Sequence, residues 1–73
     1  MPSLSYINQR LSKIDPCLEL VKGEGYHYFV FDDGKRFNTR THYVMYTSHL
    51  PLDRWLNLGR EFSIEMKEEL NAQ

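Results

Sequence analysis

The chain has 73 residues, with nine basic and ten acidic side chains and a formal net charge of -1. This length predicts one domain over residues 1–73, and the balanced charge argues against bulk attraction to nucleic acid or anionic lipid. No stretch approaches the roughly 20 apolar residues of a membrane helix, and the amino terminus lacks the apolar run of a signal peptide. The single cysteine, Cys17, excludes an internal disulfide and fits a reducing cytoplasm.

The first predicted element is a helix over residues 4–14. Its apolar residues recur at helical spacing and form one stripe, made of Leu4, Ile7, Leu11 and Ile14. Ser3 can accept a hydrogen bond from the first turn. The Asp15-Pro16 pair ends the helix, because the residue before a proline avoids the α region.

Two strands are predicted next, over residues 17–22 and 26–31, with a glycine-bracketed turn between them. The second strand is an aromatic run of strong strand propensity. The Asp33-Gly34 pair after it is a hairpin signal, because glycine tolerates positive φ. Phe29 and Phe31 are expected to face inward. The alternate residues Tyr26, Tyr28 and Val30 then face away from the core.

The third strand is expected within residues 36–47, and residues 43–46 show the strongest strand pattern. Two registers are compatible with the sequence. A tight turn at Asp33-Gly34 pairs Tyr28 with Thr39, whereas a wider loop through Arg40 pairs the aromatic run with residues 43–46. A slip of one residue reverses every side chain, so the face assignments depend on this register.

The last predicted element is a helix that starts near Pro51, which suits a first helical turn. Its apolar stripe consists of Leu52, Trp55, Leu56, Gly59, Phe62, Met66 and Leu70. Glycine inside a helix lowers its stability, so Gly59 predicts a close approach to the sheet or to the first helix. Leu58 and Ile64 fall off the stripe.

The order α-β-β-β-α predicts an α+β fold, with a three-stranded antiparallel meander and both helices on one face. The predicted core consists of Leu4, Ile7, Leu11, Ile14, Leu20, Phe29, Phe31, Val44, Leu52, Trp55, Phe62 and Met66. The other face of the sheet is then open to water or to a partner.

The open face is the predicted partner-binding site, made of Tyr26, Tyr28, Val30, Tyr43 and Met45. Tyrosine and methionine are enriched at protein interfaces. A weak symmetric homodimer would cover the same residues on both copies. Tyrosine is equally common on solvent-facing sheets, so an ordinary wet surface stays open as the alternative.

No enzymatic site is predicted. Three histidines are present, His27, His42 and His49, without the spacing of a metal motif. Turn chemistry accounts for Asp32-Asp33, and the glycine-bracketed turn at residues 23–25 lacks the Gly-Lys-Ser/Thr of a phosphate loop. No serine lies in a nucleophile elbow. We therefore expect no catalytic residue, metal or cofactor.

Nucleic acid is the alternative partner. The basic residues Lys35, Arg36 and Arg40 gather around the second hairpin. The element order is also that of double-stranded RNA-binding domains, which hold phosphates with basic residues at the start of the last helix. The matching stretch here has one negative and one positive charge, Asp53 and Arg54, which weakens this alternative.

Residues 20–29, which run Leu-Val-Lys-Gly-Glu-Gly-Tyr-His-Tyr-Phe, and residues 50–56, Leu-Pro-Leu-Asp-Arg-Trp-Leu, resemble small uncharacterised proteins of bacteriophages and prophages. The chain departs from them at residues 46–48. The resemblance implies no catalytic residues. It implies a bacterial cytoplasmic setting during infection, where such proteins bind and inhibit host machinery in host takeover or anti-defence.

Overall fold

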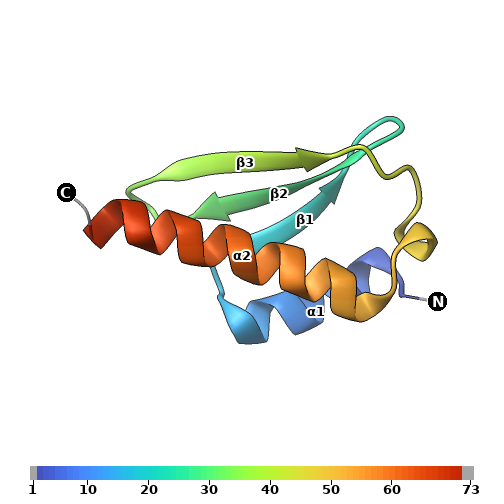
Figure 1. Ribbon diagram of the computed structural model, residues 1–73, viewed down its shortest axis with the longest axis horizontal. Coiled ribbons are helices and arrows are strands. Elements are labelled where there is room, and N and C mark those ends of the chain that lie inside the picture. Colours follow the sequence, from blue (N-terminus) through green and yellow to red (C-terminus); the bar gives the residue numbers. More distant parts are fainter. Residues whose placement is uncertain (1, 72–73) are drawn as a thin grey trace.

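The computed structural model describes residues 2–71, and the side chains of residues 2–68. Its elements are α1 (Leu4–Ile14), β1 (Leu18–Lys22), β2 (His27–Asp32), β3 (Phe37–His42), the short 3-10 helix η1 (Thr47–His49) and α2 (Leu52–Asn71). The strands form one antiparallel sheet in the order β1-β2-β3, and both helices lie on the same side of it (Figure 1). The predicted α+β fold is confirmed.

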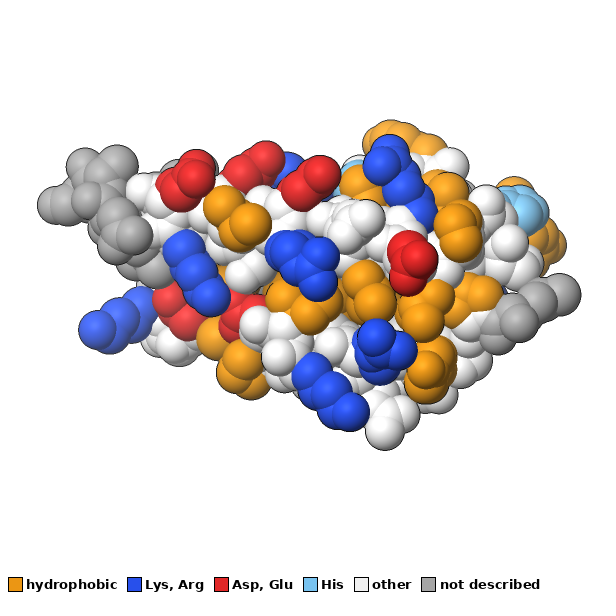
Figure 2. Space-filling view, turned by 60° about the horizontal axis from the view of Figure 1, so that its bottom comes forward, with side chains coloured by type: hydrophobic (Ala, Val, Ile, Leu, Met, Phe, Trp, Pro, Cys, Tyr) orange, Lys and Arg blue, Asp and Glu red, His pale blue; other side chains and the backbone are white. Residues whose placement is uncertain are grey.

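The outer surface of the helices carries charged side chains of both signs together with some exposed apolar ones, such as Tyr6 and Ile64. Figure 2 shows Lys and Arg side chains interspersed with Asp and Glu over this side of the molecule. Within residues 2–71, neither helix combines the length and the apolar composition needed to cross a bilayer.

The first helix begins and ends where its sequence predicts. The Tyr6 N–H donates to Ser3 Oγ at 3.2 Å, which caps the first turn. At the other end, the Asp15 N–H donates to the Leu11 carbonyl at 2.9 Å. The stripe is sufficient to bury the middle of α1, because Ile7 and Leu11 are both fully buried.

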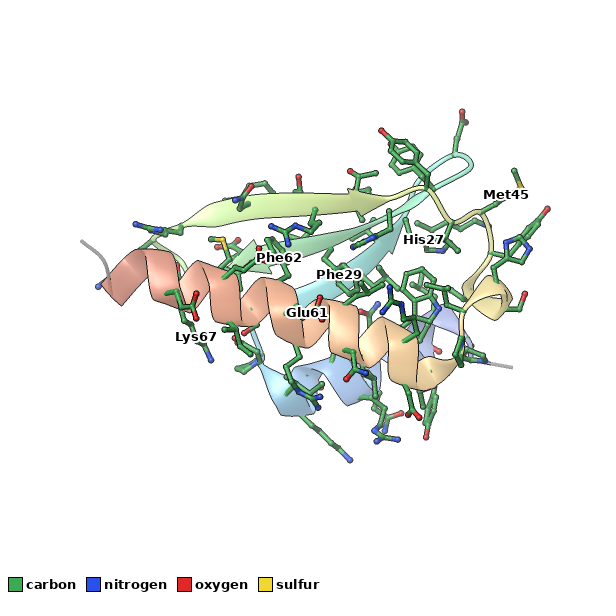
Figure 3. The ribbon with its side chains drawn as sticks, viewed as in Figure 1. His27, Phe29, Met45, Glu61, Phe62 and Lys67 are labelled. Carbon is green, nitrogen blue, oxygen red and sulfur yellow. The ribbon has the colours of Figure 1, made fainter. Side chains whose placement is uncertain are left out.

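The core lies between the sheet and the two helices. It consists of Ile7, Leu11, Leu18, Leu20, Phe29, Phe31, Trp55, Leu56, Phe62 and Met66. Phe29 and Phe31 face inward as predicted, and Figure 3 shows Phe29 and Phe62 between α2 and the strands. The Trp55 ring packs edge-on to Phe29, and its Nε1 donates to the Thr47 carbonyl at 2.9 Å.

Four residues of the predicted core, Leu4, Ile14, Val44 and Leu52, are partly buried and flank it. Leu70, which the sequence places on the apolar stripe of the last helix, lies outside the residues whose side chains are described.

Gly59 lets α2 pass close to both α1 and the sheet, as predicted. A Cβ atom at this position would lie 2.7 Å from Leu11 Cδ2 and 3.2 Å from the Phe29 ring. Those distances are shorter than ordinary van der Waals contacts, so a larger residue would push the two helices apart or displace Phe29.

The third strand lies within the predicted range of residues 36–47, but residues 43–46, where the strand pattern is strongest, are not part of it. That strand covers Phe37–His42, and Tyr28 pairs with Thr41 instead of with either predicted partner. A four-residue turn sets this register. Asp33 Oδ1 accepts the Lys35 N–H at 2.9 Å and the Arg36 N–H at 2.7 Å.

The register differs by two residues from the one that a tight turn would give. Side chains alternate with a period of two, so each residue keeps its predicted face. The strand ends because the Val44 N–H donates to the His42 carbonyl at 2.8 Å, which is a γ-turn centred on Tyr43. Tyr43 and Met45 therefore lie beyond the strand in which they were predicted.

Candidate functional site

The open sheet face is built from alternate residues of all three strands. Val21 pairs with Tyr28, which pairs with Thr41, and Val30 pairs with both Glu19 and Thr39. These side chains point away from the helices, because Phe29 and Phe31 occupy the alternate positions and are buried. Val21, Tyr28 and Val30 are half-buried. At the end of the face next to the β2–β3 turn, Phe37 pairs with Asp32 and is 69% exposed.

Tyr26 extends this face beyond the start of β2. Its ring centroid lies 6.0 Å from that of Tyr28. The ring also lies over Gly23, because a Cβ atom there would be 2.3 Å from Tyr26 Cζ. Gly23 thus leaves room for the tyrosine pair. The structure brings Tyr26, Tyr28 and Val30 together on one face, as the sequence predicts.

Tyr43 and Met45, the other predicted members, are placed differently from each other. Tyr43 is 89% exposed and follows β3 two residues after Thr41, the partner of Tyr28, so it lies at the same end of the sheet as the tyrosine pair. Met45 instead lines a pocket with His27, whose side chain faces the helices. The open face as built therefore excludes Met45.

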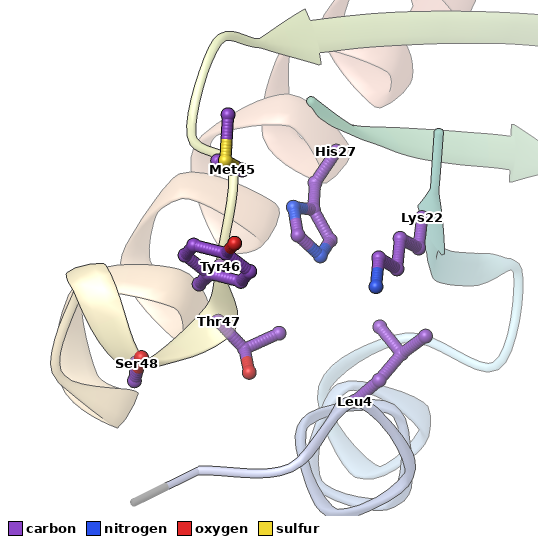
Figure 4. A pocket seen from close by; sticks show the side chains of 7 residues that line it. All are labelled: Leu4, Lys22, His27, Met45, Tyr46, Thr47 and Ser48. Carbon is purple, nitrogen blue, oxygen red and sulfur yellow. The ribbon is translucent and has the colours of Figure 1, made fainter. Parts of the chain in front are cut away.

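The pocket has a volume of about 250 Å³ and lies between the start of α1, the end of β1 and the segment that follows β3 (Figure 4). Its lining residues are Leu4, Lys22, His27, Met45, Tyr46, Thr47 and Ser48. His27 is buried and already engaged: its Nδ1 lies 2.7 Å from the Val44 carbonyl, and its ring packs against Trp55. The lining brings one ammonium group and three hydroxyl groups together, without a carboxylate to act with them.

The predicted basic patch is divided between two places. Arg40 points to the helical side of the sheet, where it forms an ion pair with Glu65 and lies over the Phe62 ring at 5.1 Å from its centroid. Lys35 and Arg36 lie in the β2–β3 turn, whose backbone is held by Asp33. Arg40 is thus held against α2, whereas Lys35 and Arg36 belong to the turn.

A buried polar cluster at the end of α1 escaped prediction. Asp15 is 4% exposed and accepts hydrogen bonds from Ser63 Oγ at 2.6 Å and the Cys17 N–H at 3.0 Å. Lys67 Nζ lies 3.3 Å from the same carboxylate. Burial alone would raise the pKa of Asp15, but these partners outweigh it and the pKa lies below its usual value.

This cluster is structural. Burial, together with the nearby Asp15 charge, raises the pKa of the Cys17 thiol, which is the opposite of what a reactive cysteine needs. The Ser63 hydroxyl donates to Asp15, so the pair ties α2 to the end of α1. Among residues 2–68, no group of three His, Cys, Asp or Glu side chains is placed to hold a metal ion.

Comparisons of the chain with protein-family models, with curated proteins and with solved structures find no match. What the chain binds is therefore inferred from its own surfaces, and the open sheet face is the one that gathers the tyrosine pair.

Proposed function

We propose that this chain is a non-enzymatic binding module of the phage type, which occupies a surface of a host protein through its open sheet face. The observation that carries the proposal is the one-sided sheet, which leaves Tyr26, Tyr28 and Val30 uncovered by either helix. The host and inhibitor setting rests on the resemblance of residues 20–29 and 50–56 to small phage proteins.

The charges of this face favour a protein partner over a nucleic acid. By the strand alternation, the charged residues on it are Glu19 and Asp32, and both are acidic. Nucleic-acid binding depends on Lys and Arg side chains that neutralise phosphates. Tyrosines, by contrast, supply rigid amphipathic area to a protein interface at low entropic cost.

The size of the sheet limits how the face can bind. Three strands about 4.8 Å apart and about 20 Å long cover roughly 300 Å². A stable protein interface buries about 800 Å² on each partner. The exposed rim must therefore contribute, and Tyr43, at the end of the sheet where Tyr26 lies, is the best placed residue to do so. Binding of this kind inhibits by occlusion, without turnover.

A pull-down from bacterial lysate with matched baits tests the proposal. We expect the wild-type chain to recover one host protein in stoichiometric amount, with or without nuclease. Tyr28→Asp places a charge in the centre of the face and should abolish recovery while leaving the circular dichroism spectrum unchanged. Gln9→Asp adds the same charge at an exposed position of α1 and should retain the host protein.

Two outcomes would contradict this function. Recovery of nucleic acid alone, lost at moderate salt, would favour the alternative partner and the residues Lys35, Arg36 and Arg40. Full recovery of the host protein by Tyr28→Asp would show that the open face is an ordinary solvent-exposed surface.

A further inference from the structure

The two edges of the sheet are treated differently. At the β1 edge, the side-chain amide of Asn8 donates from Nδ2 to the Leu20 carbonyl at 2.9 Å, and its Oδ1 accepts the Leu20 N–H at 2.7 Å. The carboxamide thus satisfies the backbone of Leu20 as a neighbouring strand would. Another chain cannot pair there without displacing α1.

β3 forms the other edge of the sheet, with no further strand beyond it among residues 2–71. The Asp33 N–H donates to the Arg36 carbonyl, in register with the β2–β3 ladder. Hydrogen-bonded and non-hydrogen-bonded pairs alternate along an antiparallel ladder. The backbones of Phe37, Thr39 and Thr41 therefore point away from β2, and all three residues are exposed.

The sequence of β3 is complementary to itself when it is reversed about Thr39. In that antiparallel pairing, Phe37 faces Thr41 of the other copy on the outer side of the sheet. On the inner side, Asn38 faces Arg40. Aromatic residues opposite β-branched residues, and threonine opposite threonine, are favourable cross-strand pairs.

Other centres of symmetry are less favourable. A centre at Arg40 opposes two guanidinium groups, and a centre at Asn38 opposes Arg40 and Arg36. A centre at Thr41 would need residues beyond 42, where the γ-turn has already ended the strand. Thr39 is thus the centre that keeps like charges apart and uses the whole strand.

We propose that β3 is a self-association edge, which pairs antiparallel with β3 of a second copy of this chain with Thr39 on the two-fold axis. The pairing joins two three-stranded sheets into one of six strands and makes their open faces continuous. It enlarges the surface assigned to the host protein, but it does not require that partner.

Asn38 competes with this pairing. Its Oδ1 accepts the Thr39 N–H at 2.8 Å, which is the group that a second copy would engage. Pairing must release this bond, so association is expected to be weak. Asn38→Ala should tighten it.

Cysteine cross-linking in a Cys17→Ser background measures the register directly. Hydrogen-bonded antiparallel partners lie about 5.5 Å apart at Cα, which is within the range of a disulfide. Thr39→Cys should therefore form a disulfide-linked dimer. In Thr41→Cys, the two cysteines of the dimer lie about four positions apart along the paired strands, or about 13 Å. Its cross-linking should therefore be about tenfold slower than that of Thr39→Cys, or absent. A mixture of Phe37→Cys and Thr41→Cys should cross-link as a heterodimer.

All three substitutions lie at exposed positions, so folding is retained. A monomeric Thr39→Cys under oxidation, or equal self-cross-linking by Thr39→Cys and Thr41→Cys, overturns the proposal. A Tyr28→Asp chain that still cross-links through Thr39→Cys but recovers no host protein would show that the edge and the face act separately.

Discussion

The two edge strands, β1 and β3, flank the same central strand but join the fold by different means. The inward residues of β1 are Leu18 and Leu20, which are buried in the core. The corresponding residues of β3 are Asn38, Arg40 and His42, none of which is fully buried. A strand can therefore be part of a small sheet without a single apolar side chain directed at the core.

The inner side chains of β3 make polar contacts with α2. Arg40 pairs with Glu65, and Asn38 Nδ2 donates to Met66 Sδ at 3.6 Å. The His42 ring lies edge-on to Phe29 at 5.6 Å, and its Nε2 is buried without a hydrogen-bond partner. Because these contacts are few and partly exposed, we expect β3 to contribute less stability than β1.

The largest effect should come from the core that β1 shares with the helices. Trp55→Ala removes a fully buried ring and the hydrogen bond to Thr47, and should lower the free energy of unfolding by about 3–5 kcal/mol. That loss is enough to unfold a domain of this size. Urea denaturation followed by circular dichroism measures it. A cooperative transition with an unchanged midpoint would mean that Trp55 is not part of the core.

The comparison of the two sheet edges predicts that Asn8→Ala lowers the free energy of unfolding by less than Trp55→Ala. Without the carboxamide, the N–H and carbonyl of Leu20 lose their partners, at a cost of about 1–3 kcal/mol. Gln9→Ala, at the exposed neighbouring position, should stay within about 0.5 kcal/mol of wild type. Equal midpoints for the two variants would show that Asn8 is dispensable.

Acid should weaken the side of the molecule that holds α1. The pKa of Asp15 is lowered in the folded state, because the bonds from Ser63, Cys17 and Lys67 outweigh burial. A depressed carboxyl pKa stabilises the fold above the unfolded value of about 4, and this contribution is lost as the pH falls through the folded pKa. Asp15→Asn should be less stable than wild type at pH 7, with a smaller further loss on acidification. Denaturant midpoints measured from pH 7 to pH 3 check this.

The smallest effect concerns β3. Burial lowers the pKa of His42, and the charges of Arg40 and Arg54 lower it further, against an opposing effect of Glu61. The unfolded chain therefore takes up this proton first, so stability should decline as the pH falls below about 6.5. His42→Phe removes the titration and should flatten the dependence of the midpoint between pH 7 and pH 5. An unchanged dependence would contradict the assigned environment of His42.

The bounds of the first helix and the inward-facing residues of β2 could be predicted from the sequence, because they depend on residues close together along the chain. The bounds of α1, its Ser3 cap and the inward phenylalanines are set by helical period, capping chemistry and strand alternation. Gly59 is a local clue as well, since a glycine inside an apolar helical stripe has little other reason to be there. The tyrosine pair of the open face follows from the same alternation.

The position of β3 could not be read in this way. Residues 43–46 are richer in strand-forming side chains than Phe37–His42. Strand propensity is a weak preference, however, and the pairing register with β2 decides which residues form the strand. The register is set by the carboxylate of Asp33 in a four-residue turn and by the γ-turn at Tyr43. Both features depend on how the chain folds back on β2, which cannot be predicted from the spacing of apolar residues in the sequence.

By itself, then, the sequence determined the order of the main helices and strands, the apolar stripe of each helix and the two faces of β2, because each is a matter of local period and propensity. Only the tertiary structure decided that Asn8 closes one edge of the sheet, that Asp15 meets Ser63, and that β3 presents Thr39 at an open edge. These features depend on polar groups that are distant in sequence. The partner of a polar side chain is not recorded in the local sequence pattern, because it is set only when the backbone brings the two groups together.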